Sequence, residues 1–217
     1  MRILALDFSS ARRSAAVGNG SGSIREVAEQ RPGHDMRPFD LIESALQAAA
    51  RRREDIEVLA IGIGPGSYTG IRVAIALAQG WHLATDAKLL GISSVECMAA
   101  QIAIQEKEGQ FQIVVDAQRG EFYRASYLAE SGRAQVVTPL QIVTRAEVEH
   151  HASAGELIVG PEVTRWFPHG REVFPSAATL AQLAASRLDF VTAENLTPIY
   201  LRETTFVKAP PPRRLPL

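Results

Sequence analysis

The sequence LALDFSS at residues 4–10 leads through a turn to SAAVG at 14–18, and QIVVDAQRG at 112–120 leads in the same way to EFYRASYL at 121–128. In each stretch an apolar run ends in an aspartate, and a polar turn separates it from a second strand-forming run. Two halves built alike indicate a duplication, although one such match also arises by chance in α/β proteins.

Around these stretches, apolar runs alternate with amphipathic segments. The runs at 3–6, 14–17 and 24–28 predict an antiparallel meander, with Asn-Gly-Ser-Gly at 19–22 as the hairpin turn. Helical spacing predicts helices over 36–53 and 69–84, and a third from Val95 to near Gly109. Continuous apolar runs predict buried strands at 58–63 and 89–92. Strands alternating with helices after a meander indicate an α/β fold.

The second half is predicted to add a strand at 157–159, a helix over 176–189 that Ser176 caps, and a last apolar piece at 197–201. Charge and glycine interrupt the pattern at 106–110, and we place the boundary between two lobes there. The prediction is an N-terminal lobe of residues 1–106 that carries the GPGSYTGIR helix, a C-terminal lobe of residues 107–209, and a mobile tail at 210–217.

Composition limits the possible functions. The chain has 217 residues, 46% of them hydrophobic, and a formal net charge of -1, which argues against a large basic surface for nucleic acid. Its single cysteine, Cys97, excludes an intramolecular disulfide, favours a cytoplasmic protein, and is interpreted as a buried apolar residue. The apolar run that Asp7 ends is too short for a signal peptide or a membrane span.

GPGSYTGIR at residues 64–72 lies between a predicted buried strand and a helix. Such a glycine-rich turn before a helix can bind an anion, because unpaired amides and the helix dipole face outward there. The phosphate-binding loop of nucleotide hydrolases needs Lys and Ser or Thr after its last glycine, where this chain has Ile71 and Arg72. We therefore favour a tight structural turn with Thr69 capping the helix.

The helix that follows this turn, IRVAIALAQGWHLA at residues 71–84, is apolar nearly all round. Such a helix is buried on several sides, either inside its own domain or against another protein. Its small residues also allow a neighbouring helix to approach closely.

Five segments carry a family resemblance: LALDFSS, IGIGPGSYTGIRVAIALAQG, LLGISSVECMA, VVDAQRGEFYRASY and TPIYLR. In this order, and across the whole chain, they resemble the TsaB family, also called YeaZ. The resemblance implies the duplicated, ribonuclease-H-like fold that actin and the sugar kinases share, with two lobes and a cleft between them.

The resemblance also implies a function. Members of this family are non-catalytic partners of the paralogue TsaD, which forms N6-threonylcarbamoyladenosine next to the anticodon of tRNAs that read ANN codons. The chain is then expected to act by forming a heterodimer with TsaD and, in isolation, to form a homodimer. TsaE and a TsaC-type enzyme complete the system, tRNA is reached only through the complex, and no membrane is involved.

The resemblance and the apolar helix together give a docking hypothesis, in which the helices on either side of GPGSYTG bundle with the equivalent helices of TsaD. The predicted interface residues are Met36, Phe39, Ile42, Tyr68, Ile71, Arg72, Ile75, Ala78 and Gln79. A bulky charged residue in place of Ala78 is expected to abolish association and leave the fold largely intact.

The catalytic paralogue carries a His-x-x-x-His metal pair, and the corresponding stretch here is HDMRP, in which His34 is followed by Pro38 at the second position. Neither a metal site nor a catalytic residue is therefore predicted. Asp7, Ser9 and Ser10 resemble the phosphate-contacting turn of the kinase-like fold, but the glycines that would wrap phosphate are missing. We expect any nucleotide contact there to be weak or completed by the partner.

We thus expect no cofactor of the chain's own, with ATP or ADP and metal on TsaD and TsaE or at the shared interface. Two alternatives have the same fold, a kinase-like ATPase and a metallopeptidase. The missing phosphate loop counts against the first alternative, and the incomplete HDMRP pair counts against the second.

Overall fold

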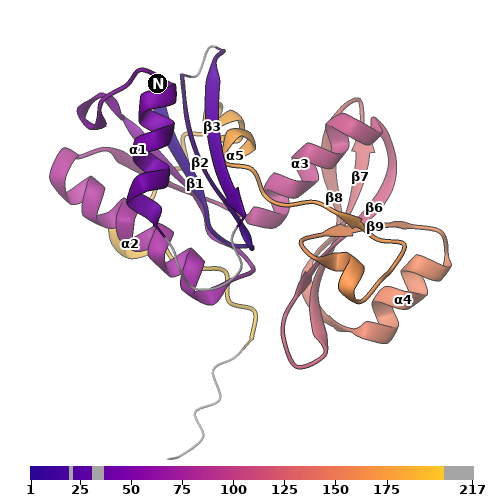
Figure 1. The fold of residues 1–217 in the computed structure, drawn as a ribbon. Helices are drawn as coiled ribbons and strands as arrows, with labels where there is room; N and C mark the ends of the chain where they lie inside the picture. Colours follow the sequence, from indigo (N-terminus) through magenta and orange to yellow (C-terminus); the bar gives the residue numbers. More distant parts are fainter. Residues whose placement is uncertain (20–21, 31–36, 203–217) are drawn as a thin grey trace, which may run out of the picture.

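A computed structural model describes residues 1–19, 22–30 and 37–202, and it divides into two lobes (Figure 1). The first lobe is built on a five-stranded sheet in the order β3-β2-β1-β4-β5. Its strands are β1 (Arg2–Asp7), β2 (Arg12–Asn19), β3 (Ile24–Gln30), β4 (Val58–Gly62) and β5 (Lys88–Ile92). β1, β2 and β3 form the predicted antiparallel meander, and β4 and β5 run parallel to β1.

The second lobe repeats this topology. Its strands are β6 (Glu108–Asp116), β7 (Glu121–Glu130), β8 (Arg133–Thr144), β9 (Leu157–Gly160) and β10 (Arg171–Glu172). They are ordered β8-β7-β6-β9-β10. This order matches that of the first sheet when β6 to β10 are equated with β1 to β5 in turn. β6 and β7 are antiparallel, and β9 and β10 follow the direction of β6. The duplicated two-lobe α/β fold predicted from the sequence is confirmed.

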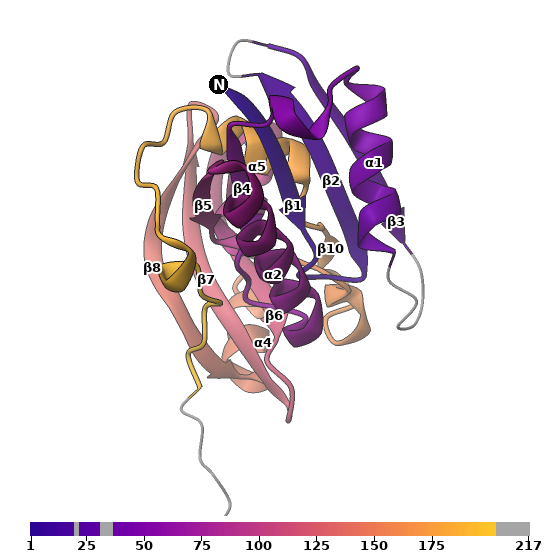
Figure 2. The same ribbon diagram turned by 90° about the vertical axis from the view of Figure 1, so that its left-hand side faces the viewer.

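Each lobe covers one face of its sheet with its own helices. In the first lobe, α1 (Pro38–Ala48) and α2 (Tyr68–Thr85) pack on the same face, where their apolar residues share a core with Leu4 and Leu59 (Figure 2). In the second lobe, α4 (Arg145–Ser153) contributes Val148 to a core against one face of the second sheet.

The two remaining helices are exchanged between the lobes. α3 (Ser94–Glu106) follows β5 but packs its apolar residues on the second sheet, in a core with Phe111 and Tyr127. α5 (Ala177–Ala184) follows β10 but packs on the free face of the first sheet, in a core with Ile3 and Ala5. The chain therefore crosses between the lobes before α3 and again before α5.

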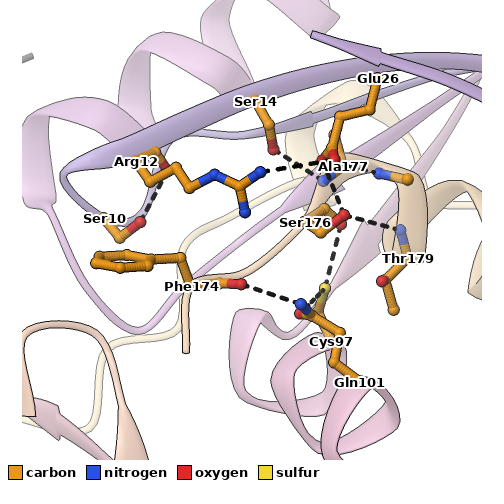
Figure 3. A network of polar contacts seen from close by, with 11 residues as sticks. Ser10, Arg12, Ser14, Glu26, Cys97, Gln101, Phe174, Ser176, Ala177 and Thr179 are labelled. Carbon is orange, nitrogen blue, oxygen red and sulfur yellow. Dashed lines mark hydrogen bonds and ion pairs between the residues drawn. The ribbon is translucent and has the colours of Figure 1, made fainter. Parts of the chain in front are cut away.

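Polar contacts fix the start of α5 on the first lobe (Figure 3). The Ala177 amide donates to the Ser14 hydroxyl at 2.8 Å, and the Ser176 hydroxyl donates to Glu26 Oε1 at 2.8 Å. The Cys97 thiol on α3 donates to the Ser176 carbonyl at 3.3 Å, so the two crossings lie side by side. Cys97 is fully buried, as the sequence suggested, and burial raises the pKa of its thiol.

The exchange changes the predicted lobe boundary. Residues 107–209 were expected to form the second lobe, whereas α5 and Leu196 lie in cores of the first, and Val191 bridges to Leu89 of β5. The apolar face of α5 closes the sheet face that α1 and α2 leave open. An amphipathic pattern shows that a helix has such a face, but not which sheet the face covers.

Several element ends also differ from the prediction. The helix expected over 36–53 ends at Ala48, and the helix expected over 176–189 ends at Ala184, although Ser176 is its cap as predicted. Residues 197–201 form no strand, and β8 was not predicted. Residues 20 and 21 of the expected hairpin turn, and the tail at 210–217, lie outside the described residues. None of the helices seen in the described ranges has the length and apolar character needed to span a membrane.

The helix exchange predicts that a cavity-forming mutation in α5 lowers the free energy of unfolding. Leu180 is fully buried against the first sheet, so Leu180→Ala should lower the free energy of unfolding by about 2–5 kcal/mol, the usual cost of such a cavity. Leu188, 82% exposed just after the helix, provides the control, and Leu188→Ala should change stability by less than about 0.5 kcal/mol. Urea unfolding of both variants measures this, and equal effects would contradict the packing described.

Candidate functional site: the α2 face and the interlobe cleft

Asp7 is the last residue of β1, and its carboxylate is fully buried. Its Oδ1 accepts hydrogen bonds from the Ser9 amide at 2.9 Å and the Ser9 hydroxyl at 2.7 Å. Its Oδ2 accepts from the Ser94 hydroxyl at 2.7 Å. Burial raises the pKa of Asp7, and the hydrogen bonds from Ser9 and Ser94 oppose that rise only in part.

This carboxylate does not fit a metal or phosphate ligand. A Cβ atom on Gly62 would lie 2.0 Å from Asp7 Oδ2, so the carboxylate is pressed against the backbone of β4. Both of its oxygens already accept hydrogen bonds within the chain. Of the three predicted nucleotide contacts, Ser9 and Ser10 line the cleft between the lobes, and Asp7 does not.

GPGSYTG packs its backbone tightly against the turn after β1. The Ser67 amide donates to the Ser9 carbonyl at 2.7 Å. A Cβ atom on Gly66 would lie 2.1 Å from the Ser9 oxygen, and one on Gly70 would lie 1.9 Å from the Phe8 oxygen. These two glycines are therefore required by close backbone approach. The structure agrees with the tight structural turn that the sequence favoured.

The cap of α2 is Ser67 and not Thr69. The Ser67 side chain accepts a hydrogen bond from the Gly70 amide at 3.3 Å, which satisfies one of the free donors at the helix start. Thr69 lies one residue inside the helix and is exposed. The sequence could not separate the two residues, because both are hydroxyl side chains directly before the apolar run.

The turn after β6 repeats the arrangement at Asp7 in the second lobe. Asp116 accepts hydrogen bonds from the Gln118 amide at 2.7 Å and from the Gln118 side-chain nitrogen at 2.9 Å. Each aspartate thus bonds the amide two residues further on, at the end of the first strand of its sheet. This turn also needs left-handed backbone, since φ is 64° at Gln118 and 61° at Arg119.

A cavity of about 730 Å³ lies between the two aspartate turns. The first lobe, the second lobe and the segment at residues 199–200 all contribute to its walls. The lining residues are Ser9, Ser10, Ala11, Arg13, Gly66, Ser67, Tyr68, Ile71, Val115, Asp116, Ala117, Gln118, Tyr123, Pro161, Glu162, Arg165, Trp166, Ile199 and Tyr200.

The predicted interface residues fall into two groups. Ile42 of α1 and Ile71, Ile75 and Ala78 of α2 are buried in the core of their own lobe. These four side chains stabilise the fold, and their burial leaves them little surface for a partner. The expectation for Ala78 is corrected accordingly: a bulky charged residue there would disrupt the first lobe instead of testing association.

The remaining predicted residues face outward, with two exceptions. Phe39 is 63% exposed and Tyr68 is 58% exposed, and Arg72 is exposed beside Tyr68. Gln79 is half-buried and donates from its side chain to the Ala193 carbonyl at 2.7 Å. Met36 lies outside the described residues, as does His34 of HDMRP.

The outer side of α2 carries exposed residues three or four positions apart that the prediction did not name in full. They are Thr69, Arg72, Ala76, Gly80 and Leu83, which we call the α2 stripe. Leu83 is 86% exposed, and nothing lies within 4 Å of the place where a Cβ on Gly80 would point. Because the helix is apolar nearly all round, its sequence pattern could not show which side faces outward.

A small aromatic cluster stands where the α2 stripe meets the cleft. The rings of Tyr68 and Tyr200 have centroids 6.0 Å apart, and the Arg72 guanidinium lies 4.7 Å from the Tyr68 ring centroid and donates to its hydroxyl. Partial burial raises the pKa of Tyr200, and the nearby Arg72 opposes the rise. Tyr200 is far from Tyr68 in sequence, so sequence spacing gave no sign of this contact.

The sequence model of one protein family, described as TsaD: tRNA N6-adenosine threonylcarbamoyltransferase, matches residues 23–197. The chain belongs to this family. Among its relatives is the tRNA threonylcarbamoyladenosine biosynthesis protein TsaB of Escherichia coli (strain K12), which is 29% identical and aligns over 97% of this chain and 99% of its own length. The protein of the same name from Haemophilus influenzae is 27% identical over 97% of this chain and 98% of its own length.

A crystal structure of an uncharacterized protein from Pseudomonas aeruginosa, described as similar to peptidase YeaZ, has the same fold. It superposes with a TM-score of 0.78 at 25% identity, and covers 93% of this chain and 99% of the other. The resemblance to the TsaB (YeaZ) family is thereby confirmed. Within the described ranges, no three His, Cys, Asp or Glu side chains gather where they could hold a metal ion.

The buried state of Asp7 predicts an unusual response to substitution. Asp7→Ala leaves the three donors of Ser9 and Ser94 without their acceptor and should cost about 1–3 kcal/mol for each buried group left unsatisfied. Asp7→Asn keeps an oxygen for Ser9 and offers an amide to the Ser94 oxygen, so it should be tolerated. Urea unfolding of both variants measures the difference.

The pH dependence has a definite sign. Because the folded pKa of Asp7 lies above its unfolded value, the ionised carboxylate opposes folding, and this penalty disappears as the pH falls and the group protonates. The stability of Asp7→Asn relative to the unaltered chain should therefore rise between pH 4 and pH 7. A relative stability that falls over this range would show that the carboxylate is needed in its charged form.

The glycines of this region provide a second, paired prediction. Gly70→Ala places a Cβ against the Phe8 oxygen and should lower the free energy of unfolding by about 1–3 kcal/mol or more. Gly80→Ala adds a Cβ to an open helix position and should raise it by about 0.5–1 kcal/mol. Thermal unfolding separates the two effects, and a tolerated Gly70→Ala would contradict the close contact with the β1–β2 turn.

Proposed function

We propose that the chain is a non-catalytic subunit in the biosynthesis of tRNA threonylcarbamoyladenosine, and that it acts by docking onto a TsaD-type catalytic partner. The observation that carries the proposal is the buried Asp7 carboxylate, whose two oxygens both accept hydrogen bonds inside the chain, where an enzyme of this fold would present the group to a ligand. Membership of the family and relatives named TsaB support the pathway.

The α2 stripe supports docking as the mode of action. Ala76 and Gly80 are small and exposed, so another helix can approach α2 closely there. Leu83 offers apolar area, and Tyr68 and Arg72 belong to the residue types that most often dominate binding energy at interfaces. In the absence of the partner, the same surface would pair with a second copy of the chain and give a homodimer.

The other components follow from the same proposal. The catalytic partner places the threonylcarbamoyl group on tRNAs that read ANN codons, and tRNA is held by the complex, since this chain carries a net charge of only -1. ATP or ADP and metal act on TsaD and TsaE or at the interface that the subunits share. The complex works in the cytoplasm.

A reconstituted reaction tests the proposal as a whole. The chain alone, supplied with tRNA, ATP, Mg²⁺ and threonylcarbamoyl adenylate, should form no modified adenosine. The TsaD-type subunit with TsaE should form it only when this chain is added. Product from the isolated chain would refute the non-catalytic role and favour an enzyme of the same fold.

The docking surface gives a sharper prediction. Gly80→Arg places a large charged side chain in the middle of the α2 stripe, where it should weaken binding to the TsaD-type subunit at least tenfold. The fold should be unharmed, because arginine forms helices better than glycine and the position is open. Titration calorimetry measures the affinity, and circular dichroism checks the fold.

Ala146→Arg is the matched control for this experiment, since Ala146 is an exposed residue of α4 in the other lobe. It adds the same side chain to a helix surface and should leave the affinity unchanged. If Gly80→Arg binds as tightly as this control, the α2 stripe is not the docking surface.

A further inference from the structure

The last described residues run along the cleft and contact both lobes. We call residues 196–202 the C-terminal strap; in Figure 2 it descends at the yellow end of the colour scale. Leu196 is buried in the first lobe, and the Ile199 amide donates to the Ile63 carbonyl at 3.0 Å. Arg202 donates to the Ala117 carbonyl at 3.2 Å and forms an ion pair with Glu121 of the second lobe.

The strap differs from the other connections between the lobes. The crossings before α3 and before α5 lie side by side, joined by the Cys97–Ser176 hydrogen bond, and such loop residues between two lobes are where a hinge would lie. Ile199 and Tyr200, in contrast, line the cavity itself. The strap therefore holds the cleft walls together at a place where hinge motion would separate them.

The strap also touches the start of α2, next to the α2 stripe. Tyr200 packs against Tyr68, the first residue of α2, and Arg72 of the stripe covers the same Tyr68 ring. A helix laid on the α2 stripe at Arg72 would therefore disturb the Tyr68 ring, against which Tyr200 packs. Tyr200 is only two residues from Arg202, so a shift of its ring pulls on the ion pair across the cleft.

We propose that the C-terminal strap is a releasable tether that holds the interlobe cleft closed, and that docking on the α2 stripe releases it. The Arg202–Glu121 pair is suited to release, because both side chains are partly exposed and such ion pairs contribute little to stability. The tether itself follows from contacts within this chain. Its release by docking rests on the proposed function.

A distance measurement between the lobes tests the tether. Spin labels are placed on Glu54→Cys in the first lobe and Ala146→Cys in the second, both exposed, while the buried Cys97 stays unlabelled. Pulsed electron paramagnetic resonance then gives the distribution of distances. Arg202→Ala and, separately, Glu121→Gln should both shift the distribution to longer distances than in the otherwise unaltered chain.

Arg171→Ala is the control variant. It removes the same charge and an ion pair of 2.7 Å to Glu106, but this pair joins β10 to α3, and both elements pack on the second sheet. It should leave the distribution unchanged. If the two strap variants behave like Arg171→Ala, the tether is overturned.

Adding the TsaD-type subunit tests the coupling. It should shift the distance distribution of the unaltered chain towards the longer distances seen in Arg202→Ala. The distribution of Arg202→Ala itself should change little on addition of the subunit. Binding without any shift in the unaltered chain would overturn the coupling and leave the docking proposal intact. Failure to bind, measured on the same samples by calorimetry, would overturn the docking proposal and the coupling together, while the tether is judged by the strap variants alone.

Discussion

The contact between the β1–β2 turn and the GPGSYTG loop is the constraint on which the rest of the first lobe depends. Two backbones meet there so closely that Gly66 and Gly70 have no room for a Cβ atom, and the Asp7 side chain leaves Gly62 no room for one either. The contact fixes the direction in which α2 crosses the sheet. The outer side of α2 carries the α2 stripe. The contact uses the Ser67 amide, which donates to the Ser9 carbonyl, and Ser9 in turn donates to the Asp7 carboxylate.

The duplicated topology explains why the two lobes enclose a cleft. Helix α3 follows the first sheet in sequence but covers the second, and α5 follows the second sheet but covers the first. Neither lobe therefore closes its core alone. The exchange fixes the two aspartate turns on opposite walls of the same cavity. A cleft is therefore a consequence of how the lobes are built, and its presence does not by itself indicate a reaction.

Much of the fold could be read from the sequence, because alternation and turn chemistry are local signals. The repeated aspartate turns, the meander and the buried strand before GPGSYTG all lie where their patterns place them. Contacts between distant segments carry no such signal, which is why the return of α5 to the first lobe and the Tyr68–Tyr200 contact went unseen. For α2, hydrophobicity alone could not separate the buried Ile71, Ile75 and Ala78 from the exposed Leu83.

The same three α2 residues divide the helix into an inner and an outer side. Their side chains are committed to the core, and on the opposite side small residues leave the backbone accessible. Tyr68 stands between these two roles, with the α2 stripe on one side and the strap on the other. If a partner docks on the α2 stripe as proposed, packing against Tyr68 is the route by which docking would reach the strap and the cleft.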